Sequence, residues 1–184
     1  AQDAGAHAVD VAGARAFVKS AGEKLVAVIN GSDTGAARRT ALTRIIDQTV
    51  DVAGVAKFCL GRFWRQATPA QQAQYTTLFH KVLVTSITAK LGDYKGVAFK
   101  VSRAMARADG AVVETEVDRP QNPPTMVQWV IATVNGAPRI VDVIAAGTSL
   151  RLTQRSDYAS YLTRNNNSIQ ALIAAMQKQV ARNG

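Results

Sequence analysis

Residues 97–145 read VAFK VSRAMARADG AVVETEVDRP QNPPTMVQWV IATVNGAPRI VDVIA, and this stretch decides the fold. Apolar and polar residues alternate over 97–101 and 113–117, the period of two that is typical of strands with one polar face. The runs 126–134 and 139–145 are apolar at nearly every position, which indicates better covered central strands. Asp109 with Gly110, and Asn135 with Gly136, favour tight hairpin turns between successive runs. The stretch therefore predicts a four-stranded antiparallel meander.

Helical spacing appears on both sides of this meander. Apolar residues recur every three or four positions over 17–29 and stop at Asn30, and shorter helices are indicated over 45–60. The clearest helix begins after Thr68, an N-cap candidate followed by Pro69 and by Gln71 of a capping box, and ends near Gly92. The segments 158–162 and 169–180 return to helical spacing. The Asn and Ser residues of 165–168 supply a cap between them.

The order of elements predicts an α+β fold. We expect a four-stranded antiparallel sheet with N- and C-terminal helices packed on one face, because an open sheet must cover its apolar face. The chain of 184 residues predicts one domain over 1–184. Within it we expect an N-terminal helix and loop over 1–39, helices over 40–92, the sheet over 93–146 and C-terminal helices over 147–184.

Composition and charge exclude several classes. Apolar runs such as 25–29 are too short to span a membrane. Cys59 is the single cysteine, which excludes an internal disulfide and a cysteine-based zinc cluster. The formal charge of +9 divides evenly, with 11 Lys+Arg and 6 Asp+Glu in residues 1–92 against 11 and 7 in residues 93–184. An even spread without a basic tail favours a polyanionic partner but leaves its kind open among DNA, anionic lipid headgroups and acidic proteins.

The first residues and the reactive side chains add little chemistry. Ala1 to Ala4 resemble the end left by a signal peptidase, and a trimmed end explains them equally well. His7 and His80 have no spacing to carboxylates that would suit a metal. Ser149 lacks the second glycine of a nucleophile elbow, and no phosphate-binding glycine loop is present. We therefore expect no catalytic residue, no metal and no cofactor.

Asp142 is the exception, a carboxylate within an otherwise apolar central strand. An unpaired carboxylate is costly there, so the structural interpretation gives Asp142 hydrogen bonds from a neighbouring loop, or an ion pair with an arginine such as Arg151. The functional interpretation makes Asp142 the general base of a small cavity enzyme. The first is favoured, because no Tyr or His partner is evident in the sequence.

Two blocks of sequence resemble a known family. Residues 52–72 read VAGVAKFCLGRFWRQATPAQQ and lead through Phe79 to LGDYKG at 91–96. The later block, VDVIAAGTSL at 141–150, is followed by Arg155 and Tyr158. The Leu-Gly, the aromatic pair, Ala-Thr-Pro-x-Gln, Tyr-x-Gly and Asp-Val-x-x-x-Gly-x-Ser-Leu follow one another as in the MlaC, or toluene-tolerance auxiliary, family. The resemblance covers roughly residues 40 to 180.

The resemblance implies a periplasmic lipid carrier, with its signal peptide removed, and not an enzyme. A curved sheet and helices would enclose an apolar pocket for the acyl tails of a phospholipid. Family members shuttle lipid between an outer-membrane lipoprotein complex and an inner-membrane ABC transporter with an MCE-domain ring, which would be the partners here. With this resemblance, the evenly spread positive charge points to headgroups, membrane surfaces or acidic docking partners and not to nucleic acid. The chain departs from the family pattern at 138–140 and 165–167, so a hopanoid ligand stays open as an alternative.

We expect the pocket walls to come from the long helix, the sheet and the block at 141–150. The candidate lipid-binding residues are Phe79, Val82, Leu83, Ile87, Leu91, Tyr94, Phe99, Val101, Val113, Val117, Val127, Trp129, Ile131, Val141, Val143 and Leu150, with Asp142 as a structural polar residue. We expect the energy for transport to come from the partner transporter, so the carrier itself needs no nucleotide.

Overall fold

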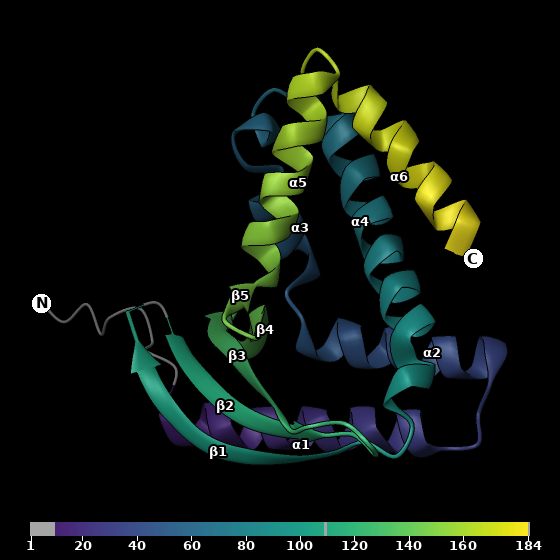
Figure 1. Ribbon diagram of the computed structural model, residues 1–184. Coiled ribbons are helices and arrows are strands. Elements are labelled where there is room, and N and C mark those ends of the chain that lie inside the picture. Colours follow the sequence, from purple (N-terminus) through teal and green to yellow (C-terminus); the bar gives the residue numbers. More distant parts are fainter. Residues whose placement is uncertain (1–9, 109, 184) are drawn as a thin grey trace, which may run out of the picture. The chain divides into compact units, whose positions relative to one another are not determined.

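The computed structural model describes residues 10–108 and 110–183, and these form two compact units (Figure 1). The first unit comprises the described residues of 1–51 together with 92–149, and the second comprises 52–91 and the described residues of 150–184. His7 and the predicted turn residue Asp109 lie outside the described residues. That the whole chain acts as one domain stays a prediction.

The first unit contains an antiparallel sheet with the strand order β1-β2-β3-β4-β5. Its strands are β1 (Ala98–Arg107), β2 (Gly110–Asp118), β3 (Thr125–Val134), β4 (Ala137–Ala145) and β5 (Thr148–Ser149). The first four confirm the predicted meander. The fifth corrects the predicted strand number, since Ala146 and Gly147 take positive φ angles of 51° and 78° and turn the chain back onto β4. A two-residue strand is too short for a period of two to reveal it.

Two β-bulges interrupt the alternation of the strands. In β1 the register shifts between Val101 and Ala104, so two residues oppose Glu114 on β2. In β4 the register passes from Ile140, opposite Ile131, to Asp142, opposite Val130, and leaves Val141 as the extra residue. Because each bulge changes which residues share a face, simple alternation misassigns the positions beyond it.

Two helices complete the first unit, α1 (Val11–Asn30) and α2 (Gly35–Thr49). α1 packs on β1 and β2 and buries one face of the sheet (Figure 1). The fully buried members of this sheet cluster are Ala14, Val18, Ala111, Val113, Ile131 and Ile140. Polar contacts tie both ends of α1 to β1 or the residues before it. Arg15 donates to the carbonyls of Ser102 and Val101, and Asn30 bonds the backbone of Gly96 and Val97.

The second unit is helical. Its elements are α3 (Val52–Leu60), η1 (Gly61–Trp64), α4 (Pro69–Lys90), α5 (Leu150–Arg164) and α6 (Ile169–Asn183), and η2 (Leu91–Tyr94) follows α4. The predicted capping box is confirmed, since the Thr68 hydroxyl accepts from the Gln71 amide and the Gln71 side chain accepts from the Thr68 amide. Ser168 caps α6 by accepting from the amide of Ala171, as the sequence predicted.

A single hydrophobic cluster holds the four helices of this unit together. α3 packs on α4 and α5, and α6 packs on α4 and α5. The fully buried members of this helical cluster are Ala56, Cys59, Leu60, Phe63, Ala67, Tyr75, Leu78, Phe79, Val82, Tyr158, Leu162, Ile169, Leu172, Ile173 and Met176. The C-terminal helices therefore build the core of the second unit together with α3 and α4.

Candidate functional site

The predicted lipid-binding residues of the long helix lie along α4 and its end. Phe79 and Val82 are buried in the helical cluster, and Leu91 is 3% exposed at the start of η2. Leu83 and Ile87 are half-buried. These two side chains keep accessible apolar surface, as a wall that receives a ligand requires.

The predicted sheet residues share one face, and this is the face that α1 covers. The strand register sets Phe99 beside Val117, Val113 beside Trp129, and Trp129 beside Val143. Val113 and Ile131 are fully buried in the sheet cluster, and the half-buried Val101, Trp129 and Val143 pack against it. Ala14 and Val18 of α1 are buried against this face.

Three further candidates lie apart from these surfaces. Tyr94 is half-buried beneath the guanidinium of Arg119, which is 4.7 Å from the centre of its ring. Val141 is the extra residue of the bulge in β4. Leu150 begins α5 and is 52% exposed. The candidates thus divide between the two units, and that they line one pocket stays a prediction.

The opposite face of the sheet carries apolar residues that the sequence interpretation missed. Val112 on β2 lies beside Val130 on β3 and Met105 on β1, and Ile144 on β4 lies beside Gln128. Val130 is 1% exposed, whereas Met105 is 39% exposed. We call Met105, Val112, Val130 and Ile144 the second sheet face. The sequence does carry a signal for this face, because 126–134 and 139–145 are apolar at nearly all successive positions, but alternation alone does not tell which face receives a ligand.

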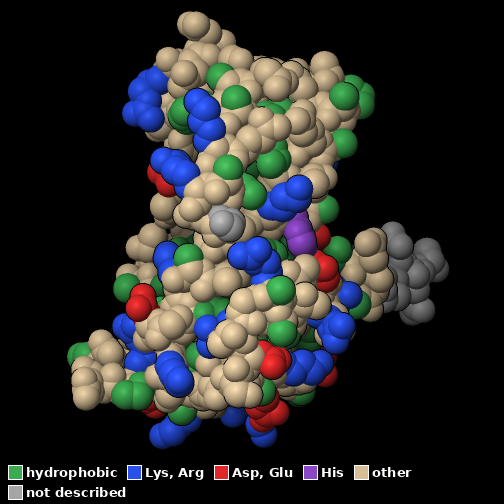
Figure 2. All heavy atoms as spheres, turned by 90° about the vertical axis from the view of Figure 1, so that its right-hand side faces the viewer, with side chains coloured by type: hydrophobic (Ala, Val, Ile, Leu, Met, Phe, Trp, Pro, Cys, Tyr) green, Lys and Arg blue, Asp and Glu red, His purple; other side chains and the backbone are tan. Residues whose placement is uncertain are grey.

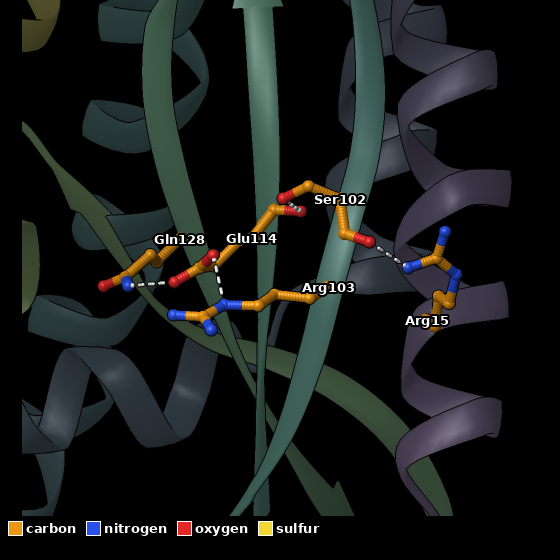
Figure 3. Close-up of polar contacts among 5 residues, drawn as sticks. All are labelled: Arg15, Ser102, Arg103, Glu114 and Gln128. Atoms are coloured by element: carbon orange, nitrogen blue, oxygen red, sulfur yellow. Dashed lines mark hydrogen bonds and ion pairs between the residues drawn. The ribbon is translucent and has the colours of Figure 1, made fainter.

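A polar network crosses the strands at the bulge in β1 (Figure 3). The Nε of Arg103 donates to Oε2 of Glu114 at 2.9 Å, and the side-chain amide of Gln128 donates to Oε1 at 3.1 Å. The hydrogen bond from Arg103 holds the pKa of Glu114 below its usual range, and the same bond raises the pKa of Arg103. Ser102 donates to the carbonyl of Glu114, so the network links β1, β2 and β3.

Asp142 is buried, at 8% exposure, and its carboxylate is hydrogen-bonded. Oδ1 accepts from the amide of Val143 at 2.8 Å, and Oδ2 accepts from the hydroxyl of Ser149 at 2.5 Å. This confirms the prediction that a neighbouring segment supplies hydrogen bonds to the carboxylate. Asp142 thereby links β5 to β4, and a structural role for it stays a prediction.

Two tyrosines form the polar part of the helical cluster. The Tyr75 hydroxyl donates to the carbonyl of Ala56 at 2.6 Å, and its ring meets that of Tyr158 edge-on with centroids 6.1 Å apart. The Tyr158 hydroxyl is buried without a hydrogen-bond partner among the described residues. Burial raises the pKa of both hydroxyls above the ordinary value.

Residues suited to metal binding or nucleophilic chemistry do not gather in the described part of the chain. Over 10–108 and 110–183, no group of three or more His, Cys, Asp or Glu side chains could hold a metal ion. His80 is half-buried on α4, and the buried Cys59 donates its thiol hydrogen to the carbonyl of Arg151 at 3.6 Å. Among the described residues, none of the helices is both long and apolar enough to cross a membrane.

A surface groove of about 690 Å³ runs along α6. Tyr161 of α5 lines it together with alanines and two cations of α6, namely Ala171, Ala174, Ala175, Lys178, Ala181 and Arg182. Small side chains and exposed cations make an open groove rather than an enclosed apolar cavity, so the groove does not fit the predicted pocket.

The comparisons with known proteins agree with this fold. The sequence model of the MlaC protein family matches residues 19–178. The chain is 27% identical over 145 residues to the toluene tolerance protein ttg2D of Pseudomonas putida, which covers 77% of this chain and 67% of that protein. It also resembles the solved structure of a phospholipid-binding protein from Ralstonia solanacearum in complex with a phospholipid. That match has a TM-score of 0.78 at 22% identity and covers 92% of this chain and 98% of the other.

The match to the Ralstonia protein shows a shared fold. The family model spans most of the sequence and includes both blocks that carried the resemblance, at 52–96 and 141–158. The chain belongs to the MlaC family.

Proposed function

We propose that this protein is a periplasmic lipid carrier that holds the acyl tails of a phospholipid and has no enzymatic activity. Membership of the MlaC family carries the proposal. The phospholipid bound to the Ralstonia protein, which has the same fold, supports it. The proposed partners are an outer-membrane lipoprotein complex and an inner-membrane ABC transporter with an MCE-domain ring. The carrier would exchange lipid with both complexes.

The physics of acyl tails suits a carrier that must both load and release. Burying a tail removes about 0.8 kcal/mol per CH₂ of unfavourable contact with water, but the tail comes from a membrane or partner that already hides it from water. The net free energy of exchange can therefore lie near zero. The carrier itself needs no nucleotide or metal for this step.

In the second unit, the proposed lipid contacts are the half-buried side chains of α4, Leu83 and Ile87. In the first unit, the proposed lipid contacts lie on the second sheet face, because α1 packs against the opposite side of the sheet. Met105 and Ile144 retain exposed apolar surface on that face. Phe99, Val101 and Trp129, which the sequence suggested as lipid contacts, would then stabilise the packing of the face that α1 covers.

Extraction and mass spectrometry test the proposal. We expect the natively purified protein to release a stoichiometric phospholipid, and a hopanoid in its place would favour the alternative ligand. Ile87→Trp and Ile144→Trp should each lower the lipid content several-fold, because a bulky ring would take the place of an acyl tail beside that residue. Ala89→Trp, on the exposed side of α4, is the matched control and should leave it unchanged. Folded protein without lipid, or the same loss in all three variants, would contradict the proposal.

Asp142→Asn separates the carrier from a small cavity enzyme, the remaining alternative. A carrier should keep its lipid and lose only stability, because the amide no longer accepts from both Ser149 and Val143 as the carboxylate does. If the extracted lipid of wild-type protein is instead chemically converted on incubation, and the variant stops that conversion, the enzyme interpretation is correct.

A further inference from the structure

The net charge of the chain belongs to one of its two units. Residues 52–91 and 150–184 hold ten Lys and Arg and a single acid, Asp157, for a formal charge of +9. The other unit holds twelve Lys and Arg and twelve Asp and Glu, for a formal charge of zero. Figure 2 shows blue side chains over the helices of the second unit and a mixture of blue and red over the first. The ten cations are Lys57, Arg62, Arg65, Lys81, Lys90, Arg151, Arg155, Arg164, Lys178 and Arg182.

Nine of these ten side chains are exposed, and Arg151 is half-buried. Two of them share one aromatic ring, since the guanidinium groups of Arg151 and Arg155 lie 4.5 and 5.0 Å from the ring centre of Phe58. Gly61 makes room for this arrangement, because a β-carbon there would lie 3.0 Å from Nε of Arg155. The shared ring brings two positive groups together at the first turns of α5.

Exposed leucines accompany the cations. Leu150 is 52% exposed and Leu152 is 56% exposed, on either side of Arg151 in the sequence. In the second unit by itself, the exposed fractions of Leu150 and Leu152 are at least this large, because contact with any other part of the chain can only reduce them. Cations spread over several helices, together with exposed leucines, match the headgroup and acyl boundary of an anionic bilayer, which offers many phosphates over a wide area.

We propose that the helical unit is a docking surface for an anionic lipid bilayer. Its arginines and lysines pair with phosphate headgroups, and Leu150 and Leu152 enter the interface beside Arg151 and Arg155. The inference rests on the proposed function for its purpose, because a carrier must approach a membrane or a membrane complex to exchange lipid. Bilayer binding itself is measurable without reference to lipid carriage.

Vesicle sedimentation with the full chain tests the proposal. We compare vesicles of phosphatidylcholine with vesicles that contain about 30% phosphatidylglycerol, at roughly 50 and 300 mM salt. We expect binding at least tenfold stronger to the anionic vesicles at low salt, and loss of most of it at high salt. The triple variant R62Q/R65Q/R155Q should weaken binding on the order of a hundredfold, because each charge near the surface contributes roughly fivefold.

A matched triple variant removes the same charge from the neutral unit. K19Q/K24Q/R44Q changes exposed residues of α1 and α2 and should alter vesicle binding less than twofold. K81Q/K90Q/R164Q repeats the test in the second unit should the first triple fail to fold. L150S/L152S should weaken binding but leave its salt dependence unchanged, because it removes no charge.

Three results would overturn the docking surface. These are equal binding to both kinds of vesicle, equal weakening by the triples of both units, or retention on an immobilised acidic polypeptide or DNA without vesicle binding. The lipid content of the same preparations separates the two proposals. Normal phospholipid without vesicle binding contradicts only the docking surface, and vesicle binding by lipid-free protein contradicts only the carrier.

Discussion

Tyr75 and Tyr158 lie in the same helical cluster, but their hydroxyls differ in hydrogen bonding. The Tyr75 hydroxyl donates at 2.6 Å to the Ala56 carbonyl, whereas that of Tyr158 is buried without a partner in the described structure. Tyr75→Phe should therefore lower the free energy of unfolding by about 1 kcal/mol, because a buried hydrogen bond to the Ala56 carbonyl is lost. Tyr158→Phe should leave it unchanged or raise it by up to about 1 kcal/mol.

Urea denaturation of the two variants measures this difference. The rings keep their edge-on contact in both cases, so each variant is the control for the other. A larger loss of stability in Tyr158→Phe than in Tyr75→Phe would show that the second hydroxyl has a partner after all.

The same two hydroxyls predict how stability depends on alkaline pH. Burial raises both pKa values above the ordinary 10.0, so the folded state keeps protons that the unfolded state releases. Below pH 10 both states hold these protons and stability is fully present. Above pH 10 it should fall by about 1.4 kcal/mol per pH unit for each tyrosine. Denaturation between pH 8 and 11 should show a shallower decline in the double Phe variant, and equal slopes would contradict the assignment.

The close packing of α1 on the sheet depends on Gly22. A β-carbon at Gly22 would overlap the ring of Phe99 on β1, whereas one at Gly13 would lie 3.6 Å from Oδ2 of Asp10, an ordinary contact. Gly13→Ala should stabilise the protein by up to about 1 kcal/mol through helix propensity. Gly22→Ala gains the same propensity but should be net destabilising, by about 1 to 2 kcal/mol, because the core is overpacked.

Thermal and urea denaturation of the two alanine variants check this prediction. Phe99→Leu in the Gly22→Ala background should recover part of the loss, which a double-mutant cycle quantifies. Equal stabilisation by both alanines would mean that Phe99 moves aside at no cost and that α1 tolerates a side chain there.

The sequence alone predicts those features of single elements that neighbouring residues determine. The capping box at Thr68 and Gln71 and the turn at Asn135 and Gly136, with φ angles of 50° and 81°, are set by neighbouring residues and were predicted. The bulge at Val141 and the strand β5 were not, because they depend on how strands pair across space. Alternation likewise shows which side chains share a face, but not that α1 covers that face.

For the molecule as a whole, the distribution of charge between the two units cannot be recognised by comparing the two halves of the sequence. The halves 1–92 and 93–184 carry nearly equal excesses of positive charge, which suggested an even spread. The chain passes between the units after Asp51, Leu91 and Ser149, so each half contributes one segment to the basic helical unit. Segregation of charge therefore emerges only once the fold is known. The candidate lipid residues divide between the units for the same reason.

This interleaving also predicts that the two units unfold together. If the second unit unfolds alone, residues 52–91 become a flexible loop of 40 residues whose ends the first unit still holds. Closing such a loop costs roughly 3 kcal/mol, and the folded second unit removes that cost. Each unit therefore stabilises the other through chain connectivity, which disfavours states with only one unit folded.

Two tryptophans allow the coupling to be measured, since Trp64 lies in η1 of the second unit and Trp129 in β3 of the first. Leu162→Ala truncates a fully buried side chain of the helical cluster and should cost about 2 to 5 kcal/mol. The Trp64→Phe background leaves Trp129 as the fluorescent reporter of the first unit, and the Trp129→Phe background leaves Trp64 as the reporter of the second. We expect Leu162→Ala to lower the urea midpoint equally in the two backgrounds. Ile131→Ala in the sheet cluster is the reciprocal control. Should Leu162→Ala shift only the Trp64 midpoint, the units would be independent, because connectivity alone would then be too weak to link their unfolding.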